Sequence, residues 1–77
     1  MVSAYVLVSV EPGNNEEVVA ALRGIQGVKQ AHACWGLPDI FAFVEVADDK
    51  TLSDTVLRGI QGIPGIRGTE THIVIPV

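Results

Sequence analysis

Hydrophobic residues along the chain alternate between strand-like and helix-like spacing. Residues 4–10 (AYVLVSV) are apolar at both odd and even positions, which predicts a β-strand covered on both faces. The next apolar positions recur at helical spacing, and Asn14 with Glu17 has the spacing of a capping box. These helical positions are Val18, Val19, Leu22 and Ile25. A second strand is predicted over residues 28–35 (VKQAHACW), before a turn at residues 36–39.

The rest of the chain shows the same order of elements. Residues 40–46 (IFAFVEV) predict a strand, and Asp48 or Asp49 is positioned to cap the helix that follows. The apolar stripe of that helix consists of Leu52, Val56 and Ile60. A final strand is predicted over residues 69–75 (TETHIVI), so that the chain has two β-α-β halves.

A repeated hexapeptide, LRGIQG, supports this division into halves. It occurs at residues 22–27 and again at residues 57–62. Each copy follows helical spacing and precedes a predicted strand, so we expect it to mark the same place in both halves. Two β-α-β halves in series predict an α+β, ferredoxin-like βαββαβ fold, with a four-stranded antiparallel sheet and both helices on one face.

One face of this predicted sheet is too apolar for a surface in contact with water. The helices are expected to cover Val6, Val8, Val10, Ile40, Ala42, Val44, Val46, Ile73 and Ile75. The opposite face then carries Tyr5, Leu7, Ser9, Phe41, Phe43, Glu45, Glu70, His72 and Val74. Because a solvated sheet face is normally polar, we expect a second copy to cover it, giving a homodimeric α/β sandwich. The predicted interface residues are Tyr5, Leu7, Phe41, Phe43, His72 and Val74. A bulge near Gly36 would interchange the two faces and is the alternative.

Composition and charge narrow the classes of partner. The chain has 77 residues, of which 48% are hydrophobic and 18% charged, which favours self-association. No apolar run approaches the ~18 residues of a membrane span, so no membrane partner is expected. Five scattered basic residues and a net charge of −4 argue against direct nucleic-acid binding. The single cysteine, Cys34, indicates a reducing cytoplasm and is predicted to be a small buried hydrophobe.

The turn between the second and third strands is the candidate ligand site. Gly36 lets a ligand approach the backbone and leaves peptide N–H groups free for a carboxylate. Asp39 offers a negative charge to an ammonium group, and Trp35 and Leu37 could form an apolar wall. The same residues also suit a plain hairpin, in which Gly36 and Pro38 set the turn and Asp39 binds nearby backbone. Both interpretations are open at this point.

Several motifs together resemble a known family. The turn W-G-L-P-D at residues 35–39, the segment I-P-G-I and the ending T-E-T-H-I-V-I resemble the effector-binding module of the Lrp/AsnC (feast/famine) regulators, also called the RAM domain. The resemblance covers nearly the whole chain, so residues 1–77 are identified as a single domain of this type. Gly36 and Asp39 match the family's G-x-x-D turn, and Thr71 matches the threonine before its last aliphatic run.

The resemblance implies a fold that pairs through its sheets and assembles further into octamers or decamers. It also implies that an amino acid or related small metabolite binds between subunits. The ligand-binding residues carried over are Trp35, Gly36, Leu37, Pro38, Asp39 and Thr71. The family often has an aromatic residue where this chain has Pro38. Most members carry an N-terminal helix-turn-helix domain, and this chain resembles the stand-alone RAM proteins instead, so it would regulate transcription by co-assembly with full-length Lrp/AsnC regulators.

An enzyme and a purely structural oligomerisation module are the alternative functions. Small dimeric proteins of this fold include cofactor-free monooxygenases and isomerases, whose sites lie between sheet and helices, where this chain is predicted to be aliphatic. His32, Cys34 and His72 lack the spacing of a zinc site, and no phosphate or dinucleotide motif is present, so no metal or cofactor is expected. Glu45, Glu70 and His72 are predicted to form a hydrogen-bond network between subunits.

Overall fold

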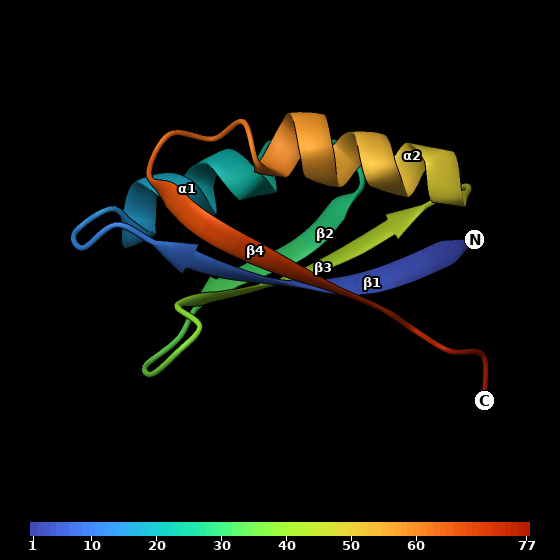
Figure 1. Cartoon of the computed structure of the whole chain (residues 1–77), viewed down its shortest axis with the longest axis horizontal. Helices are drawn as coiled ribbons and strands as arrows, with labels where there is room; N and C mark the ends of the chain where they lie inside the picture. Colours follow the sequence, from blue (N-terminus) through green and yellow to red (C-terminus); the bar gives the residue numbers. More distant parts are fainter.

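The chain folds into a four-stranded antiparallel sheet with both helices on one of its faces (Figure 1). The computed structural model describes residues 1–77. The elements in chain order are β1 (Val2–Val10), α1 (Asn15–Arg23), β2 (Val28–Ala33), β3 (Ile40–Val46), α2 (Asp49–Asp54), the π-helix η1 (Thr55–Ile60) and β4 (Ile66–Ile73). The strands lie in the order β2-β3-β1-β4, which confirms the predicted ferredoxin-like fold. None of its helices combines the length and the apolar character that crossing a membrane requires.

The hydrophobic core lies between the sheet and the helices. All 15 buried residues are apolar, and in the two central strands they alternate with residues of the opposite face. The strands contribute Ala4, Val6, Val8, Val10, Ala31, Ile40, Ala42, Val44 and Val46, and the helices contribute Val18, Val19, Leu22, Leu52, Val56 and Ile60. The strand alternation and the helical stripes read from the sequence are therefore confirmed, except for Ile25, which lies beyond the end of α1 and is only partly buried.

The two helices begin differently. Asp48 caps α2, where its Oδ1 accepts a hydrogen bond of 2.8 Å from the Thr51 N–H. Asn14 is the N-cap residue of α1, but its side chain makes no capping hydrogen bond. The capping box predicted from Asn14 and Glu17 is therefore wrong, whereas Asp48 is confirmed as a helix cap.

The two copies of LRGIQG occupy different positions in the fold, contrary to our expectation. Leu22 is fully buried near the end of α1, whereas Leu57 lies in η1 with 63% of its surface exposed. The second helix continues as a π-helix through the hexapeptide, so that Val56 and Ile60, rather than Leu57, face the core. Identical letters thus meet different surroundings because Leu22 belongs to the apolar stripe of the first helix, whereas the stripe of the second helix passes through Val56 and Ile60.

The equivalent points of the two halves are the glycines immediately before β2 and β4. Gly27 and Gly65 adopt φ of 99° and 96°, a left-handed conformation that favours glycine. The residue after each glycine donates a backbone hydrogen bond to the isoleucine three residues before it. The Val28 N–H donates to Ile25 O over 3.1 Å, and the Ile66 N–H donates to Ile63 O over 3.5 Å. The segments I-Q-G-V and I-P-G-I therefore correspond, and the hexapeptide repeat is out of step with the fold by three residues.

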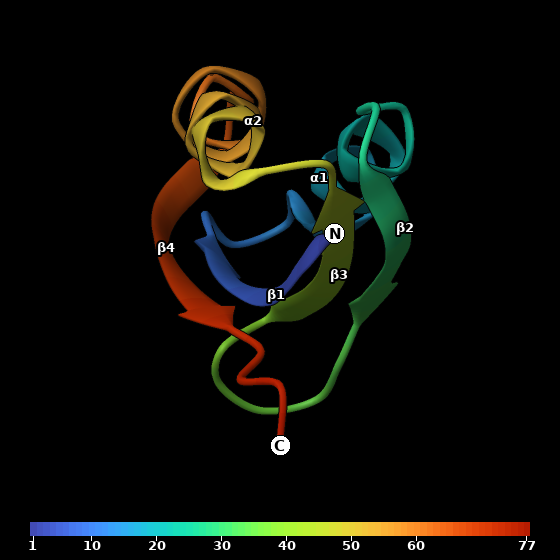
Figure 2. The same cartoon turned by 90° about the vertical axis from the view of Figure 1, so that its right-hand side faces the viewer.

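The face of the sheet away from the helices is uncovered, as the end-on view in Figure 2 shows. In the register of the sheet, Tyr5 lies between Phe43 and His72. The next row on this face places Leu7 between Phe41 and Glu70. The register shifts occur between Ser9 and Val10 and between Val28 and Gln30, and none occurs near Gly36. The predicted assignment of the two faces is therefore correct along β1 and β3.

The ends of the outer strands depart from the sequence prediction. β2 ends at Ala33 rather than at residue 35, and Cys34 is exposed instead of buried. β4 runs from Ile66 to Ile73, so it begins and ends earlier than predicted. Ile73 pairs with Ala4 on the side of the helices but is 56% exposed, and Ile75 lies beyond the strand and is also exposed. The core expected at Ile73 and Ile75 is therefore wrong, because the rest of the chain leaves both side chains mainly exposed.

Candidate functional site

The β2–β3 hairpin turn projects from one end of the sheet (Figure 1). It is closed by a hydrogen bond of 2.8 Å from the Cys34 N–H to Asp39 O. Gly36 adopts φ of 98°, so the backbone of the turn depends on glycine, although a Cβ at this position would meet only open space. Trp35 and Leu37 are almost completely exposed on either side of Gly36. The turn thus presents two apolar side chains to solvent or to a neighbour.

The Asp39 carboxylate ties the base of this turn to β1. Its Oδ2 accepts a hydrogen bond of 2.9 Å from the Val10 N–H, and Asp39 is half-buried. This contact is the backbone bond foreseen in the plain-hairpin interpretation. The other carboxylate oxygen, Oδ1, has no donor within the chain. Asp39 therefore both positions the turn and keeps one oxygen available to a ligand.

Two hollows flank the turn, and Asp39 lines both of them. One hollow, of about 560 Å³, is lined by Trp35, Gly36 and Asp39 together with the start of α1. The other, also of about 560 Å³, is lined by Leu37 and Asp39 together with the end of β1 and the start of β4. Volumes of this size suit small ligands. The structure thus brings together Trp35, Gly36, Leu37 and Asp39 of the residues that the sequence singled out.

Two of the predicted ligand residues line neither hollow. Thr71 pairs with Val6 on β1, on the side of the sheet that the helices cover, and lies further along β4 from the turn. Pro38 is half-buried, and the Leu37–Pro38 peptide bond is cis. Within one chain the site therefore consists of the turn without Thr71 or the Pro38 side chain.

Arg67 was missed by the sequence analysis. It lies at the irregularity where β4 shifts register, since Val10 pairs with Ile66 while Ser9 pairs with Gly68. It lines the hollow beside Leu37 and Asp39, and its Nε lies 3.9 Å from Glu11 Oε1. The signal that could have found it is the pairing of β1 with β4, which brings the start of the last strand to the end of the first. Arg67 and Asp39 give this hollow one charge of each sign.

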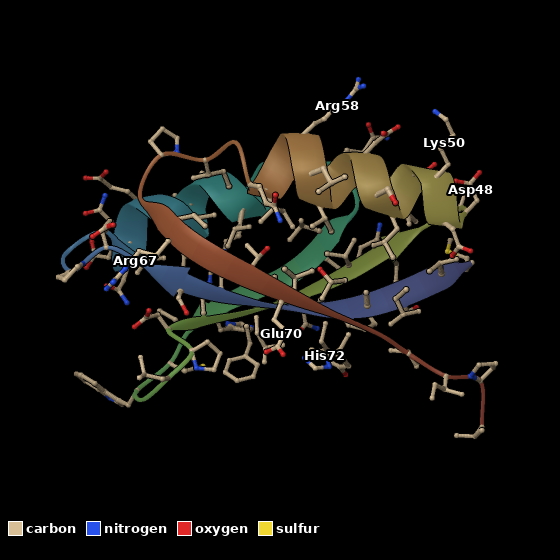
Figure 3. The ribbon with its side chains drawn as sticks, viewed as in Figure 1. Asp48, Lys50, Arg58, Arg67, Glu70 and His72 are labelled. Atoms are coloured by element: carbon tan, nitrogen blue, oxygen red, sulfur yellow. The ribbon has the colours of Figure 1, made fainter.

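The uncovered sheet face carries the other set of predicted residues. Tyr5 and Phe41 are 50% and 40% exposed, and Leu7 and Phe43 are partly exposed beside them. Figure 3 shows Glu70 and His72 pointing from β4 to the side opposite the helices. His72 Nε2 lies 3.5 Å from Glu70 Oε1, and the Ser3 hydroxyl donates to Glu45 Oε2 over 3.4 Å. The polar side chains of these residues thus lie around an apolar centre on the uncovered sheet face.

Val74, the remaining predicted interface residue, follows the end of β4. Its N–H donates to Ser3 O over 2.8 Å, so the chain continues alongside β1 for one more residue. No cluster of three or more histidine, cysteine or acidic side chains is close enough to hold a metal ion.

Comparison with known proteins places the chain in a family. The model of the Lrp/AsnC ligand binding domain matches residues 3–76. An uncharacterized HTH-type transcriptional regulator of Pyrococcus abyssi is 34% identical over 74 residues, which are 96% of this chain and 47% of that protein. The chain thus spans about half the length of this curated relative.

Solved structures agree with this assignment. A protein of Thermus thermophilus matches at a TM-score of 0.94 and 26% identity, over 100% of this chain and 96% of the other. AsnC of E. coli matches at a TM-score of 0.89 and 25% identity, over 99% of this chain and 53% of the other. The match of the family model to residues 3–76 shows that this chain belongs to the Lrp/AsnC ligand-binding domain family.

Proposed function

We propose that the chain is a self-assembling regulatory module that binds an amino acid or a related small metabolite at the β2–β3 turn. The observation that carries the proposal is the position of Asp39. One oxygen of its carboxylate anchors the turn to Val10 N–H, while the other has no protein donor at the meeting point of two hollows. A carboxylate held in this way is ready to receive an ammonium group at little cost in side-chain ordering.

The surroundings of Asp39 supply the remaining chemistry that an amino acid requires. Gly36 keeps the backbone of the turn accessible, and Arg67 on the Leu37 side offers a cation to a carboxylate. Trp35 and Leu37 offer apolar surface to the ligand's side chain. Both are almost fully exposed in a single chain, and bound small molecules are normally buried over most of their surface. A neighbouring copy therefore closes the site, with Thr71 and Pro38 available for contacts between copies.

The uncovered sheet face supplies the first step of assembly. Its centre is formed by Tyr5, Leu7, Phe41 and Phe43, with polar groups at its margins. An apolar centre with a polar rim is the arrangement found in protein interfaces. Two copies packed face to face would bury these rings and leave the helices outside, and further association would close the turns into octamers or decamers.

The family supports a regulatory role. The Pyrococcus abyssi relative is described as a transcriptional regulator, which makes co-assembly with full-length regulators the proposed route to transcription. A feast or famine regulatory protein of M. tuberculosis, solved in complex with L-methionine, matches at a TM-score of 0.82. It is 24% identical over 100% of this chain and 52% of its own, so it shares the fold and makes methionine one ligand to test. The enzyme alternative has no support in the interior, where every buried side chain is apolar.

The test is thermal unfolding of the purified protein with each of the twenty amino acids at millimolar concentration. A ligand present at about 100 times its Kd raises the free energy of unfolding by about 2.7 kcal/mol, a shift that melting detects readily. We expect a subset of amino acids to raise the melting temperature of the wild type and to leave that of Asp39→Asn unchanged. Leu57→Ser, a substitution on the exposed helix surface, is the matched control and should respond as the wild type does. If no amino acid shifts the wild type, the chain does not sense amino acids.

A further inference from the structure

Three of the five basic residues have partners within the chain. Lys50 Nζ lies 3.5 Å from Asp54 Oδ2, Arg67 Nε lies 3.9 Å from Glu11 Oε1, and Arg23 donates twice to Ala31 O over 3.1 and 2.8 Å. Lys29 and Arg58 are the other two, and neither side chain makes a hydrogen bond or an ion pair. In Figure 3 the side chain of Arg58 extends from η1 into solvent, away from the sheet.

Lys29 and Arg58 line the same hollow, although they are far apart in sequence and belong to two different layers. This hollow, of about 550 Å³, lies at the end of β3 opposite the β2–β3 turn. Only 3 of its 12 lining residues are hydrophobic. Besides the two cations, Gln26 and Thr55 contribute polar side chains, so the hollow is a polar site distinct from the two that flank the turn.

Lys29 and Arg58 each lie at a local irregularity of the fold. Lys29 lies at the register shift of β2, because Val28 pairs with Val44 while Gln30 pairs with Phe43, which leaves Lys29 without a partner residue. A bulge of this kind redirects a side chain and is enriched beside functional sites. Arg58 lies in η1, and π-helical turns are likewise rare and concentrated at functional sites. Two costly departures from regular geometry therefore converge on one hollow.

The acidic residues around the hollow offset this positive charge only in part. The Asp54 carboxylate is paired with Lys50. Glu45 also lines the hollow and keeps its negative charge, although its carboxylate accepts a hydrogen bond from the Ser3 hydroxyl. Lys29 and Arg58 therefore outnumber the one lining carboxylate that has no basic partner, in a protein whose net charge is −4. Such a site attracts an anion.

We infer that this hollow is a second ligand site, which binds the oxyanion of a small metabolite, either a phosphate or a carboxylate group. The Arg58 guanidinium of η1 can engage two oxygens of such a group at once, and Lys29 of β2 adds a point charge. Gln26 and Thr55 lie within the same lining to donate further hydrogen bonds. The inference stands apart from the amino-acid site, because it uses no residue of the β2–β3 turn.

The experiment is a titration of the isotope-labelled protein, followed by the NMR shifts of its backbone amides. Sodium pyrophosphate and sodium citrate are added to separate samples, so that phosphate and carboxylate recognition are distinguished. We expect saturable shifts at Gly27, Thr55 and Gly59 with at least one of the two anions. Lys29→Gln and Arg58→Gln should each weaken binding about tenfold, as expected for loss of one charge-assisted contact.

Arg23→Gln is the matched control, because it removes the same charge from an exposed residue that does not line the hollow, and its partner is the backbone carbonyl of Ala31 rather than an acidic residue of the hollow. It should bind the anion as tightly as the wild type. Equal weakening by Arg23→Gln would show general charge attraction and overturn the inference. Absence of saturation with either anion at millimolar concentration would overturn it as well. Neither result would bear on amino-acid binding at the turn, which the melting experiment tests separately.

Discussion

The rings of Tyr5 and Phe43 meet across β1 and β3 with their centroids 5.0 Å apart and their planes inclined at 52°. This tilted contact lies on the face of the sheet that the helices do not cover, and half of the Tyr5 surface remains exposed. Aromatic side chains bury about 150–250 Å² each in a core, at about 25 cal/mol per Å² of apolar surface, so leaving the pair half solvated forfeits a few kcal/mol. The geometry favours a second copy of the chain as the cover.

Phe43→Asp should therefore separate the proposed dimer into monomers. A charge placed at the centre of an apolar interface loses its hydration without gaining a partner. Light scattering should give about twice 8.2 kDa or more for the wild type and about 8.2 kDa for the variant. Leu57→Asp places the same charge on the helix side, where the residue is already exposed, and should keep the wild-type mass. A wild type that is itself monomeric and folded would rule out the proposed pairing.

Leu22→Ala and Leu57→Ala should differ widely in stability, although both alter the first letter of LRGIQG. Leu22 is fully buried, and truncating a buried leucine costs about 2–5 kcal/mol. Leu57 is mainly exposed, and substitutions at such sites usually change stability by less than about 0.5 kcal/mol. Urea unfolding of both variants measures the difference. Equal losses would contradict the π-helical geometry, which turns Leu57 away from the core.

Asp39→Ala should destabilise the protein more than Asp39→Asn, which keeps a weaker, neutral hydrogen bond. Alanine removes the acceptor of the Val10 N–H, and a hydrogen bond to a charged group contributes about 1.5–3 kcal/mol. Asparagine keeps an oxygen at the same place and removes only the charge. Chemical denaturation separates the two effects. Similar stability for Asp39→Ala and the wild type would mean that the turn does not depend on this bond.

Gly27→Ala should cost more stability than Gly36→Ala. Both glycines have left-handed backbone conformations, for which a side chain costs about 1–2 kcal/mol. At Gly27 the new Cβ would also lie 2.9 Å from Val46 Cγ1, whereas at Gly36 nothing lies within 4 Å. The added overlap should raise the cost at Gly27 by about 1–3 kcal/mol. The order of the two melting temperatures decides the matter, and a lower value for Gly36→Ala would contradict the close packing before β2.

Stability should fall with acid in a way that depends on Asp48. Hydrogen bonds from the Thr51 side chain and backbone N–H, with a smaller contribution from the Lys50 charge, hold the pKa of Asp48 below its ordinary value. A lowered pKa in the folded state stabilises the protein above the unfolded pKa, and this contribution is lost as the pH falls through the folded pKa. The loss is therefore expected below about pH 4.

Asp48→Asn tests this dependence, because asparagine also caps helices but does not titrate. The free energy of unfolding of the wild type should decline relative to that of Asp48→Asn as the pH drops below about 4. Asp49→Asn, one residue further along, removes an equal charge without touching the cap. Parallel pH profiles for the wild type and Asp48→Asn would show that the Thr51 contact does not form in solution.

Much of the fold followed from periodicity in the sequence. The stripe of Leu52, Val56 and Ile60 and the alternation along β1 and β3 are set by burial, which local spacing reports directly. The π-helix and the register shift at Lys29 could not be predicted, because they arise from how distant segments pack. Arg67 was missed for the same reason, since only the pairing of β1 with β4 brings it near Asp39.

Cys34 shows a different limit of prediction. Its sequence neighbours suggested a strand, but β2 ends at Ala33, where the hairpin turn leaves the sheet and nothing covers the thiol. The Gly36 and Asp39 pattern identified the turn, whereas Thr71 lies on another part of β4. Local motifs thus located the turn, and tertiary geometry decided which distant residues accompany it.

The offset between the repeated hexapeptide and the repeated fold matters to anyone who wishes to rebuild this domain from one of its halves. A gene that joined the second helix to a copy of β2 at the end of LRGIQG would place Val28 directly after Gly62, and would lose the three residues Ile63, Pro64 and Gly65 that carry the second helix into β4. The copied strand would begin three residues too early. Because a shift by an odd number of residues exchanges the two faces of a strand, its apolar side chains would face the solvent. Joined at Gly27 and Gly65 instead, the same gene would keep both halves in phase.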